Sequence, residues 1–300
     1  MKKTVLILGI LSSFNANAWS PCGIDEHGNV ANCEYQIDAQ GTLTIRGTGN
    51  NGNIGNWGEL TSNGSSLVTT APWGSYQDRI ENIVIENSIK DLGSYGFVRI
   101  KSAAAVNIPE GVTNISSNAF YSSSASEIII PNTVTEIESS AFNWSSIKKI
   151  DIPDSVKNIG GSFRGAGGLK NLIIPDSVVY MSKESLSYTD LETLTISDKT
   201  ALGEIFTGYG EESYVNFSNL KIYCTGDTAK CDANLEAAGY PQLKSQKATT
   251  QKINGVTYVY DNKGKLVTTS GHRKEKRIYT IEEANAVAKP TGNTVRIKYR

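Results

Sequence analysis

The amino-acid sequence predicts a β-rich repeat solenoid with a β cap before it and a small α+β module after it. Ile-Pro pairs begin at residues 108, 130, 152 and 174, so four consecutive pairs stand 22 residues apart. Aliphatic residues alternate ahead of each pair, which is the period-2 signal of a strand that buries one face. A phenylalanine also recurs near the end of four successive copies, at Phe97, Phe120, Phe142 and Phe163. Self-similarity at this period indicates an array of stacked units.

Each unit is predicted to place two aliphatic side chains inside the stack. One unit forms a single supersecondary element and cannot bury its apolar side by itself, so neighbouring units must cover one another. The proline then ends the strand, because it has no backbone donor and its φ is fixed. The fourth copy is one residue shorter between Ile159 and Phe163, and we expect a local distortion there. The predicted inward pairs are Ile83/Ile85, Val106/Ile108, Ile128/Ile130, Ile150/Ile152, Leu172/Ile174, Leu194/Ile196 and Leu220/Ile222.

The array and its flanks divide the chain into five predicted intervals. These are a signal peptide at 1–18, an N-terminal β cap at 19–79, the solenoid at 80–225, a C-terminal cap and linker at 226–253, and a small basic module at 254–300. Alternation around the turn at 261–264 predicts a hairpin at the start of that module. Thr280 and Glu283 form a capping box for a helix that ends before Pro290.

The repeat resembles a known family. The segment IIIPNTVTEIESSAF, residues 128–142, is similar to the BspA-type leucine-rich repeat of bacterial surface and secreted proteins. The resemblance covers roughly residues 80–225, and the stretches GTLTIRGTG and APWGSYQDRIENIVIENSI resemble the cap that often precedes such arrays. It implies that Trp73 packs against the first unit. For function it implies a binding or adhesion role whose ligand differs between members.

The first residues predict export. Lys2 and Lys3 form a basic region, residues 5–11 are apolar, and residues 16–18 read Ala-Asn-Ala, a small-x-small cleavage site. The apolar run is far shorter than the ~20 residues that span a bilayer, so we expect no integral membrane span. A cleaved signal peptide makes the protein secreted, surface-bound or periplasmic.

Four cysteines occur as two close pairs at opposite ends of the array. In an oxidising compartment, Cys22–Cys33 and Cys224–Cys231 are the favoured disulfides among three possible connectivities. The alternative is a four-ligand metal site, but neither spacing is that of the usual Cys-x-x-Cys knuckle. We therefore expect two disulfides that hold the caps, and no metal.

Charge is distributed unevenly along the chain. Residues 241–300 hold 13 Lys and Arg against 4 Asp and Glu, a net charge of +9, whereas residues 1–240 hold 16 against 26, a net charge of −10. Arg296, Lys298 and Arg300 alternate along a predicted closing strand. This basic tail either binds an anionic glycan or lipopolysaccharide, or is a solvated edge whose charges prevent aggregation. Nucleic acid is not an expected partner.

The sequence offers little catalytic chemistry. His27 and His272 are the only histidines and both lie in polar turn-like stretches, which argues against a histidine-based triad or metal site. We expect no cofactor and no catalysis. The alternative is a secreted carbohydrate-active enzyme with paired carboxylates, for which Asp151, Asp154 and Asp176 are candidates. Asp154 and Asp176 follow proline in successive units, however, where Asp and Asn favour turns.

A protein partner is the predicted ligand, and the outward side of the strands is the predicted site. We call this side the strand face. Its composition mixes charges, amides, hydroxyls and two isoleucines, which suits a protein more than a polyanion. Trp57, in a loop rich in Gly and Asn, is a further candidate contact. The predicted strand-face residues are Asn82, Val84, Asn107, Glu127, Ile129, Lys149, Asp151, Asn171, Ile173, Thr193, Thr195 and Lys221, with Ala105 and Asn219 beside them.

Overall fold

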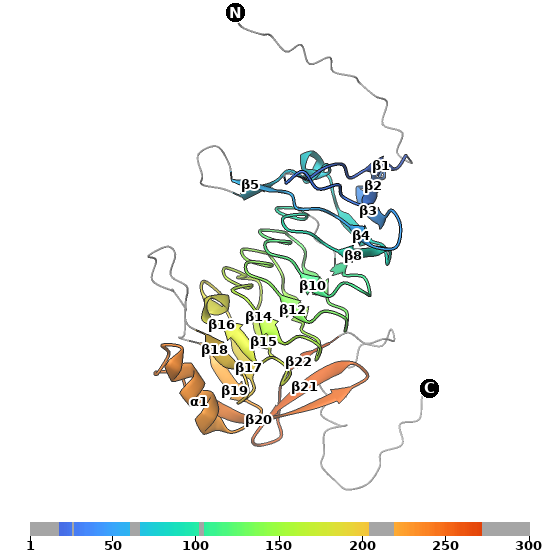
Figure 1. Ribbon diagram of the computed structural model, residues 1–300. Helices are drawn as coiled ribbons and strands as arrows, with labels where there is room; N and C mark the ends of the chain where they lie inside the picture. The colour runs from blue at the N-terminus through green and yellow to red at the C-terminus, as the bar shows by residue number, and fades with distance from the viewer. Residues whose placement is uncertain (1–17, 26, 61–66, 102–104, 204–218, 272–300) are drawn as a thin grey trace, which may run out of the picture.

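The computed structural model describes residues 18–25, 27–60, 67–101, 105–203 and 219–271. It confirms the β-rich solenoid, in which successive units stack along one axis from the N-terminal cap to helix α1 (Figure 1). The strands that precede the prolines, and those at the same repeat position in units without the proline, form one side of the stack. They are β7 (Asn82–Ile85), β9 (Ala105–Asn107), β11 (Glu127–Ile129), β13 (Lys149–Asp151), β15 (Asn171–Ile173), β17 (Thr193–Ile196) and β19 (Lys221–Cys224).

These strands are parallel and keep the phase of the repeat. Ile128 of β11 lies between Val106 of β9 and Ile150 of β13, each one repeat away. Leu194 of β17 likewise lies between Leu172 and Ile222. The in-register stack of Ile-Pro units that the sequence predicts is therefore present.

A second parallel sheet forms the return path of each unit. It contains β10 (Asn114–Ile115), β12 (Glu136–Ile137), β14 (Asn158–Ile159), β16 (Tyr180–Ser182) and β18 (Ala201–Gly203), in that order. One aliphatic residue or methionine from each strand is buried, because the alternate side chain points outward. We call the outward side of these strands, together with the exposed residue that precedes β16, the return face; that residue is Val179, which is 52% exposed.

The core lies between the two sheets and continues through all units. Of the fourteen predicted inward residues, thirteen are buried and Leu220 is partly buried against the same cluster. The rings of Phe97, Phe120, Phe142 and Phe163 stack with centroids 5.0, 5.8 and 5.7 Å apart. Trp73 extends this column, 6.2 Å from Phe97, and donates its indole N–H to the Gly96 carbonyl. The predicted packing of Trp73 on the first unit is confirmed.

The shortened fourth unit is accommodated by glycine and serine. A Cβ on Gly160 would lie 2.7 Å from the backbone nitrogen of Ser139, so the two units approach too closely for a larger residue. Ser162 donates its hydroxyl to the Glu138 carbonyl at 2.6 Å, and Ser185 donates to the Gly160 carbonyl at 2.6 Å. These hydroxyls add contacts between units beside β14, whose pairing with β12 and β16 is kept.

The N-terminal cap contributes one more layer to the stack. Strands β1 (Ser20–Pro21), β2 (Cys33–Ile37) and β3 (Thr42–Gly47) are antiparallel, and β3 then pairs in parallel with β7. The Asp38 carboxylate accepts from the Gln40 and Thr42 amides in the turn between β2 and β3. The remaining cap elements are β4 (Gly52–Asn53), β5 (Gly58–Leu60), β6 (Leu67–Thr69), the 3-10 helix η1 (Gly74–Tyr76) and β8 (Ile89–Asp91).

The C-terminal end differs from the sequence prediction in one respect. Helix α1 (Thr228–Ala237) follows β19, and the predicted hairpin is formed by β21 (Val256–Asp261) and β22 (Leu266–Ser270). Residues 242–253, however, were expected as a linker, and most of them form strand β20 (Ser245–Ile253). This strand pairs with β19 on one side and with β21 on the other, so the hairpin continues the solenoid sheet.

Both predicted disulfides, Cys22–Cys33 and Cys224–Cys231, are present. The first joins β2 to the segment that follows β1. The second joins the end of β19 to α1. Each therefore closes one end of the stack, as the cysteine spacing predicts.

Candidate functional site

The strand face is divided into an open part and a covered part by the segment β20–β22. The six strands β15, β17, β19, β20, β21 and β22 form one sheet, and this sheet curls until β22 contacts β13 and β15. The last strand therefore lies across the face of earlier units. We call β7 to β13 the open part, and β15 to β19 the covered part.

The covered part corrects the prediction of one continuous exposed surface. Ile173 is 7% exposed and Thr195 is fully buried, although alternation along their strands predicts that both point to solvent. Ile173 packs with Tyr223 of β19 and with Ala248 and Val259 of the added strands. Both side chains point away from the core, as predicted, but the later segment β20–β22 covers them.

Polar contacts hold the last strand against the stack. The Asp151 carboxylate accepts from the Ser270 hydroxyl and from the Gly271 amide, and Lys149 donates to the Gly271 carbonyl at 3.2 Å. Asp151 and Lys149, predicted as part of a ligand surface, thus contact the chain itself. They mark the border between the open and covered parts.

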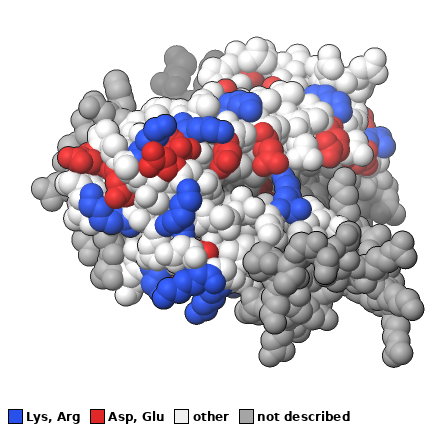
Figure 2. All heavy atoms as spheres, turned by 90° about the horizontal axis from the view of Figure 1, so that it is seen from below, with Lys and Arg blue, Asp and Glu red and all other residues white. Residues whose placement is uncertain are grey.

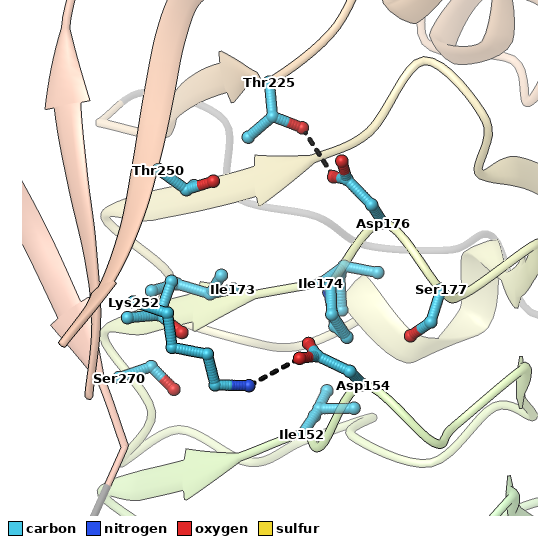
Figure 3. Close-up of a pocket in the computed structure, with 12 residues that line it drawn as sticks. Ile152, Asp154, Ile173, Ile174, Asp176, Ser177, Thr225, Thr250, Lys252 and Ser270 are labelled. Carbon is cyan, nitrogen blue, oxygen red and sulfur yellow. Dashed lines mark hydrogen bonds and ion pairs between the residues drawn. The ribbon is translucent and has the colours of Figure 1, made fainter. Parts of the chain in front are cut away.

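A cleft opens where the curled sheet separates from the proline turns. It has a volume of about 470 Å³. Ile152 and Ile174 lie at its base, while Lys252 of β20 extends across it to the Asp154 carboxylate at 2.5 Å (Figure 3). Asp176, one unit further along, accepts from the Thr225 hydroxyl at 2.9 Å. The other residues of the lining are Ile173, Pro175, Ser177, Thr250, Thr257 and Ser270.

The open part combines apolar and charged side chains. Val84 is 46% exposed, Ile129 is half-buried, and Asn82 and Asn107 are exposed. Glu127 of β11 and Lys149 of β13 form an ion pair between neighbouring units, with a carboxylate oxygen 3.0 Å from the ammonium nitrogen. Seen from below, the described residues show a row of acidic side chains with basic ones beside it, and no broad area of one sign (Figure 2).

Exposure along the covered part is confined to the starts of its strands. Asn171 and Lys221 are exposed, and Thr193 donates its hydroxyl to the Asn171 amide oxygen at 2.7 Å. These residues lie at the rim of the curled sheet. The structure therefore separates the predicted set into an open group, a rim and two buried residues.

Trp57 is not a surface contact. It is 5% exposed, and its indole N–H donates to the Ile54 carbonyl at 2.6 Å. The glycine-rich loop folds over the ring, which explains why loop composition predicted the wrong environment. An exposed tryptophan occurs instead at Trp144, which is 46% exposed with its ring centroid 5.7 Å from that of Tyr188.

Several predicted features lie outside the described residues. These are the signal peptide core at 1–17, the helix after Thr280, and the basic side chains Arg296, Lys298 and Arg300. Their roles remain predictions. In the described ranges, no helix is long and apolar enough to cross a membrane, and no cluster of three or more His, Cys, Asp or Glu side chains is placed to hold a metal ion.

The fold and its open strand face define a class, a repeat solenoid with parallel strands and an exposed sheet surface. A family model described as a BspA type leucine-rich repeat region of six copies matches residues 75–192 and 135–231, together more than half of the chain. This chain therefore belongs to the BspA-type leucine-rich repeat family, as the repeat pattern indicated.

Three solved structures to which this chain is similar are of bacterial proteins. The pneumococcal vaccine antigen PcpA is 17% identical, with 78% of this chain and 53% of that chain covered and a TM-score of 0.40. A leucine-rich repeat protein from Eubacterium ventriosum is 14% identical, with 78% and 47% covered and a TM-score of 0.42. One from Bacteroides ovatus is 18% identical, with 65% and 67% covered and a TM-score of 0.30. This chain thus spans about half the length of the first two. No curated protein matches it.

Proposed function

We propose that this chain is an exported, non-catalytic binding protein that engages a protein partner through the open part of its strand face. Family membership supports an interaction role at or outside the cell envelope. Stacked repeats present extended, rigid surfaces, which is how solenoids generally bind their partners. Adhesion to a host or envelope protein is the specific role that we propose.

The observation that carries this proposal is the exposure of Val84 and the partial exposure of Ile129 on the open part. A partly apolar centre bordered by charges is the composition of a protein interface, since apolar contacts contribute affinity and charges contribute specificity. The ion pair between Glu127 and Lys149 lies within this surface. Charged groups on such a surface fix the orientation of a partner more than they increase affinity.

The candidate carboxylates support a structural role in place of glycoside hydrolysis. Asp151 accepts from Ser270 and Gly271, Asp154 pairs with Lys252, and Asp176 accepts from Thr225. Each of these contacts links a proline turn or strand end to a later part of the fold. Binding without turnover is therefore the function we propose.

The test uses matched valines on the two faces. A photo-crosslinking residue at Asn107 would capture and identify the partner on producing or host cells. The affinity of that partner is then measured for Val84→Glu, with Val179→Glu on the return face as the control. We expect Val84→Glu to weaken binding by about tenfold or more and Val179→Glu to leave it unchanged. Equal effects of the two changes would overturn the proposal.

Export is tested separately by fractionating cells that produce the intact chain. We expect mature protein, cleaved after residue 18, in the periplasm, at the surface or in the medium. A chain without residues 1–18 should remain in the cytoplasm. Retention of both chains there would contradict the proposed location.

A further inference from the structure

The cleft beneath β20 has a chemistry different from that of the open strand face. Ile152 and Ile174 provide an apolar base, and hydroxyls of Thr225, Thr250 and Ser270 surround it. Mouths of curled or closed sheets are common positions for ligands, because strand ends and connecting turns meet there. The cleft is large enough for one side chain or small molecule.

Charge within the cleft is only partly balanced. Lys252 neutralises Asp154, whereas the described partner of Asp176 is the neutral hydroxyl of Thr225. One carboxylate therefore remains without a counter-charge among the described residues. The Ser177 hydroxyl, which also lines the cleft, is buried without a hydrogen-bond partner in the described structure. The Asp176 carboxylate favours a ligand that donates hydrogen bonds and carries positive charge, and the Ser177 hydroxyl can accept one of those hydrogen bonds.

The repeat itself shows that a carboxylate is not required in this position. The residue after proline is Glu110, Asn132, Asp154 and Asp176 in successive units. Asn132 fills this turn position with an uncharged amide. The turn therefore explains why the residue is polar, but it does not explain why the residue is charged in other units. The two aspartates occur in the two units that line the cleft.

From these observations we infer that the cleft binds a cationic side chain with an aliphatic stem, an arginine or lysine of a peptide. The stem would pack on Ile152 and Ile174 while the guanidinium or ammonium group pairs with Asp176. This site is independent of the open strand face. A partner with a basic residue beside its docking surface would be recognised by both.

The experiment follows isoleucine methyl NMR signals of the full chain during titration with N-acetyl-arginine amide and N-acetyl-lysine amide. For ligands of this size we expect dissociation constants on the order of 1 mM. The signals of Ile152 and Ile174 should shift. N-acetyl-citrulline amide, which has nearly the same shape without the charge, should bind at least about fivefold more weakly.

Two substitutions should change the affinity in opposite directions. Asp176→Asn installs the residue type found at position 132 and should weaken arginine binding about fivefold, whereas Glu110→Gln, in the same position outside the cleft, should not. Lys252→Met removes the internal cation and should strengthen binding. The Ile173 signal shows whether β20–β22 stays in place in each variant.

The inference fails if the cationic ligands shift no cleft signal, or if citrulline amide or N-acetylglucosamine binds as well as arginine amide. It also fails if Asp176→Asn has no effect while the Ile173 signal is unchanged. These outcomes leave the proposal for the open strand face intact, because that test uses Val84 and an identified partner.

Discussion

The open and covered parts of the strand face carry the same repeat but have different surroundings. Ile129 and Ile173 occupy the same position in units two repeats apart, and both side chains point away from the core between the sheets. Ile129 is half-buried, whereas Ile173 is 7% exposed under the curled sheet. The comparison shows that a repeat determines direction, while the rest of the chain determines exposure. A binding face in a solenoid is therefore what the flanking segments leave uncovered.

The largest expected effect concerns the core that the two parts share. Phe142 lies in the middle of the aromatic column, so Phe142→Ala should lower the free energy of unfolding by about 3–5 kcal/mol. Trp144→Ala, two residues away and 46% exposed, is the control and should cost far less. Urea unfolding followed by circular dichroism measures both. Hydrogen exchange should show that the open and covered parts are destabilised together; loss of protection in one part only would show separate cores.

The matched isoleucines test the comparison directly. Ile173→Ala removes a side chain packed against Tyr223, Ala248 and Val259, and should cost about 2 kcal/mol. Ile129→Ala, on the open part, should change stability by no more than about 0.5 kcal/mol. Both costs are measured from the denaturant midpoints of the parent chain and the two variants, compared at a common denaturant slope. Equal costs would mean that β20–β22 does not cover the face in solution.

Much of the solenoid could be predicted from sequence, because each unit repeats its own burial pattern. Val106, Ile128 and Ile150 become neighbours through a constant spacing, and no distant contact is needed to place them. The aromatic column follows for the same reason. The missing residue between Ile159 and Phe163 also predicted where the array departs from regularity.

The segment β20–β22, which covers part of the strand face, and the cleft beneath it could not be predicted in the same way. Strand β20 reads SQKATTQKI, and its residues that face the stack include Ala248, Thr250 and Lys252. A strand that packs with small and polar residues has no apolar alternation, so its sequence is typical of a linker. The cleft forms between units 150–177 and strands after 245, and only the three-dimensional pairing of β19 with β20 brings them together.

A smaller effect on stability is expected at the ion pair between Lys252 and Asp154, which joins β20 to the stacked units. The side chains of Lys252 and Asp154 are 49% and 66% exposed, so their attraction is screened by solvent. A double-mutant cycle with Lys252→Met and Asp154→Asn should give a coupling free energy below about 1 kcal/mol, decreasing at high salt. A coupling of several kcal/mol would mean that this pair, and not the Ile173 cluster, holds the covered part closed.

The smallest expected effect is a pH dependence of stability at the contact between Asp198 and the residue that precedes α1. The Asp227 amide donates to the Asp198 carboxylate at 3.1 Å and lowers the pKa of Asp198 below its ordinary value of 3.8. Because this pKa is lower in the folded chain than in the unfolded chain, the carboxylate contributes stability above pH 3.8. The contribution is lost as the pH falls through the lower, folded-state value.

Asp198→Asn removes this pH dependence. The difference in unfolding free energy between the parent chain and the variant should therefore be constant from neutral pH down to about pH 5, and should shrink below pH 4. Because the Asp198 carboxylate lies near the surface and is partly screened by solvent, we expect the difference to be small at every pH. Asp190→Asn, a change of the same kind at an exposed carboxylate paired with Lys170, is the control. A difference that grows on acidification would mean that the Asp227 amide does not stabilise the charged form of Asp198. The start of α1 would then be held by its own cap at Asp227, whose side chain accepts from the Ala229 amide.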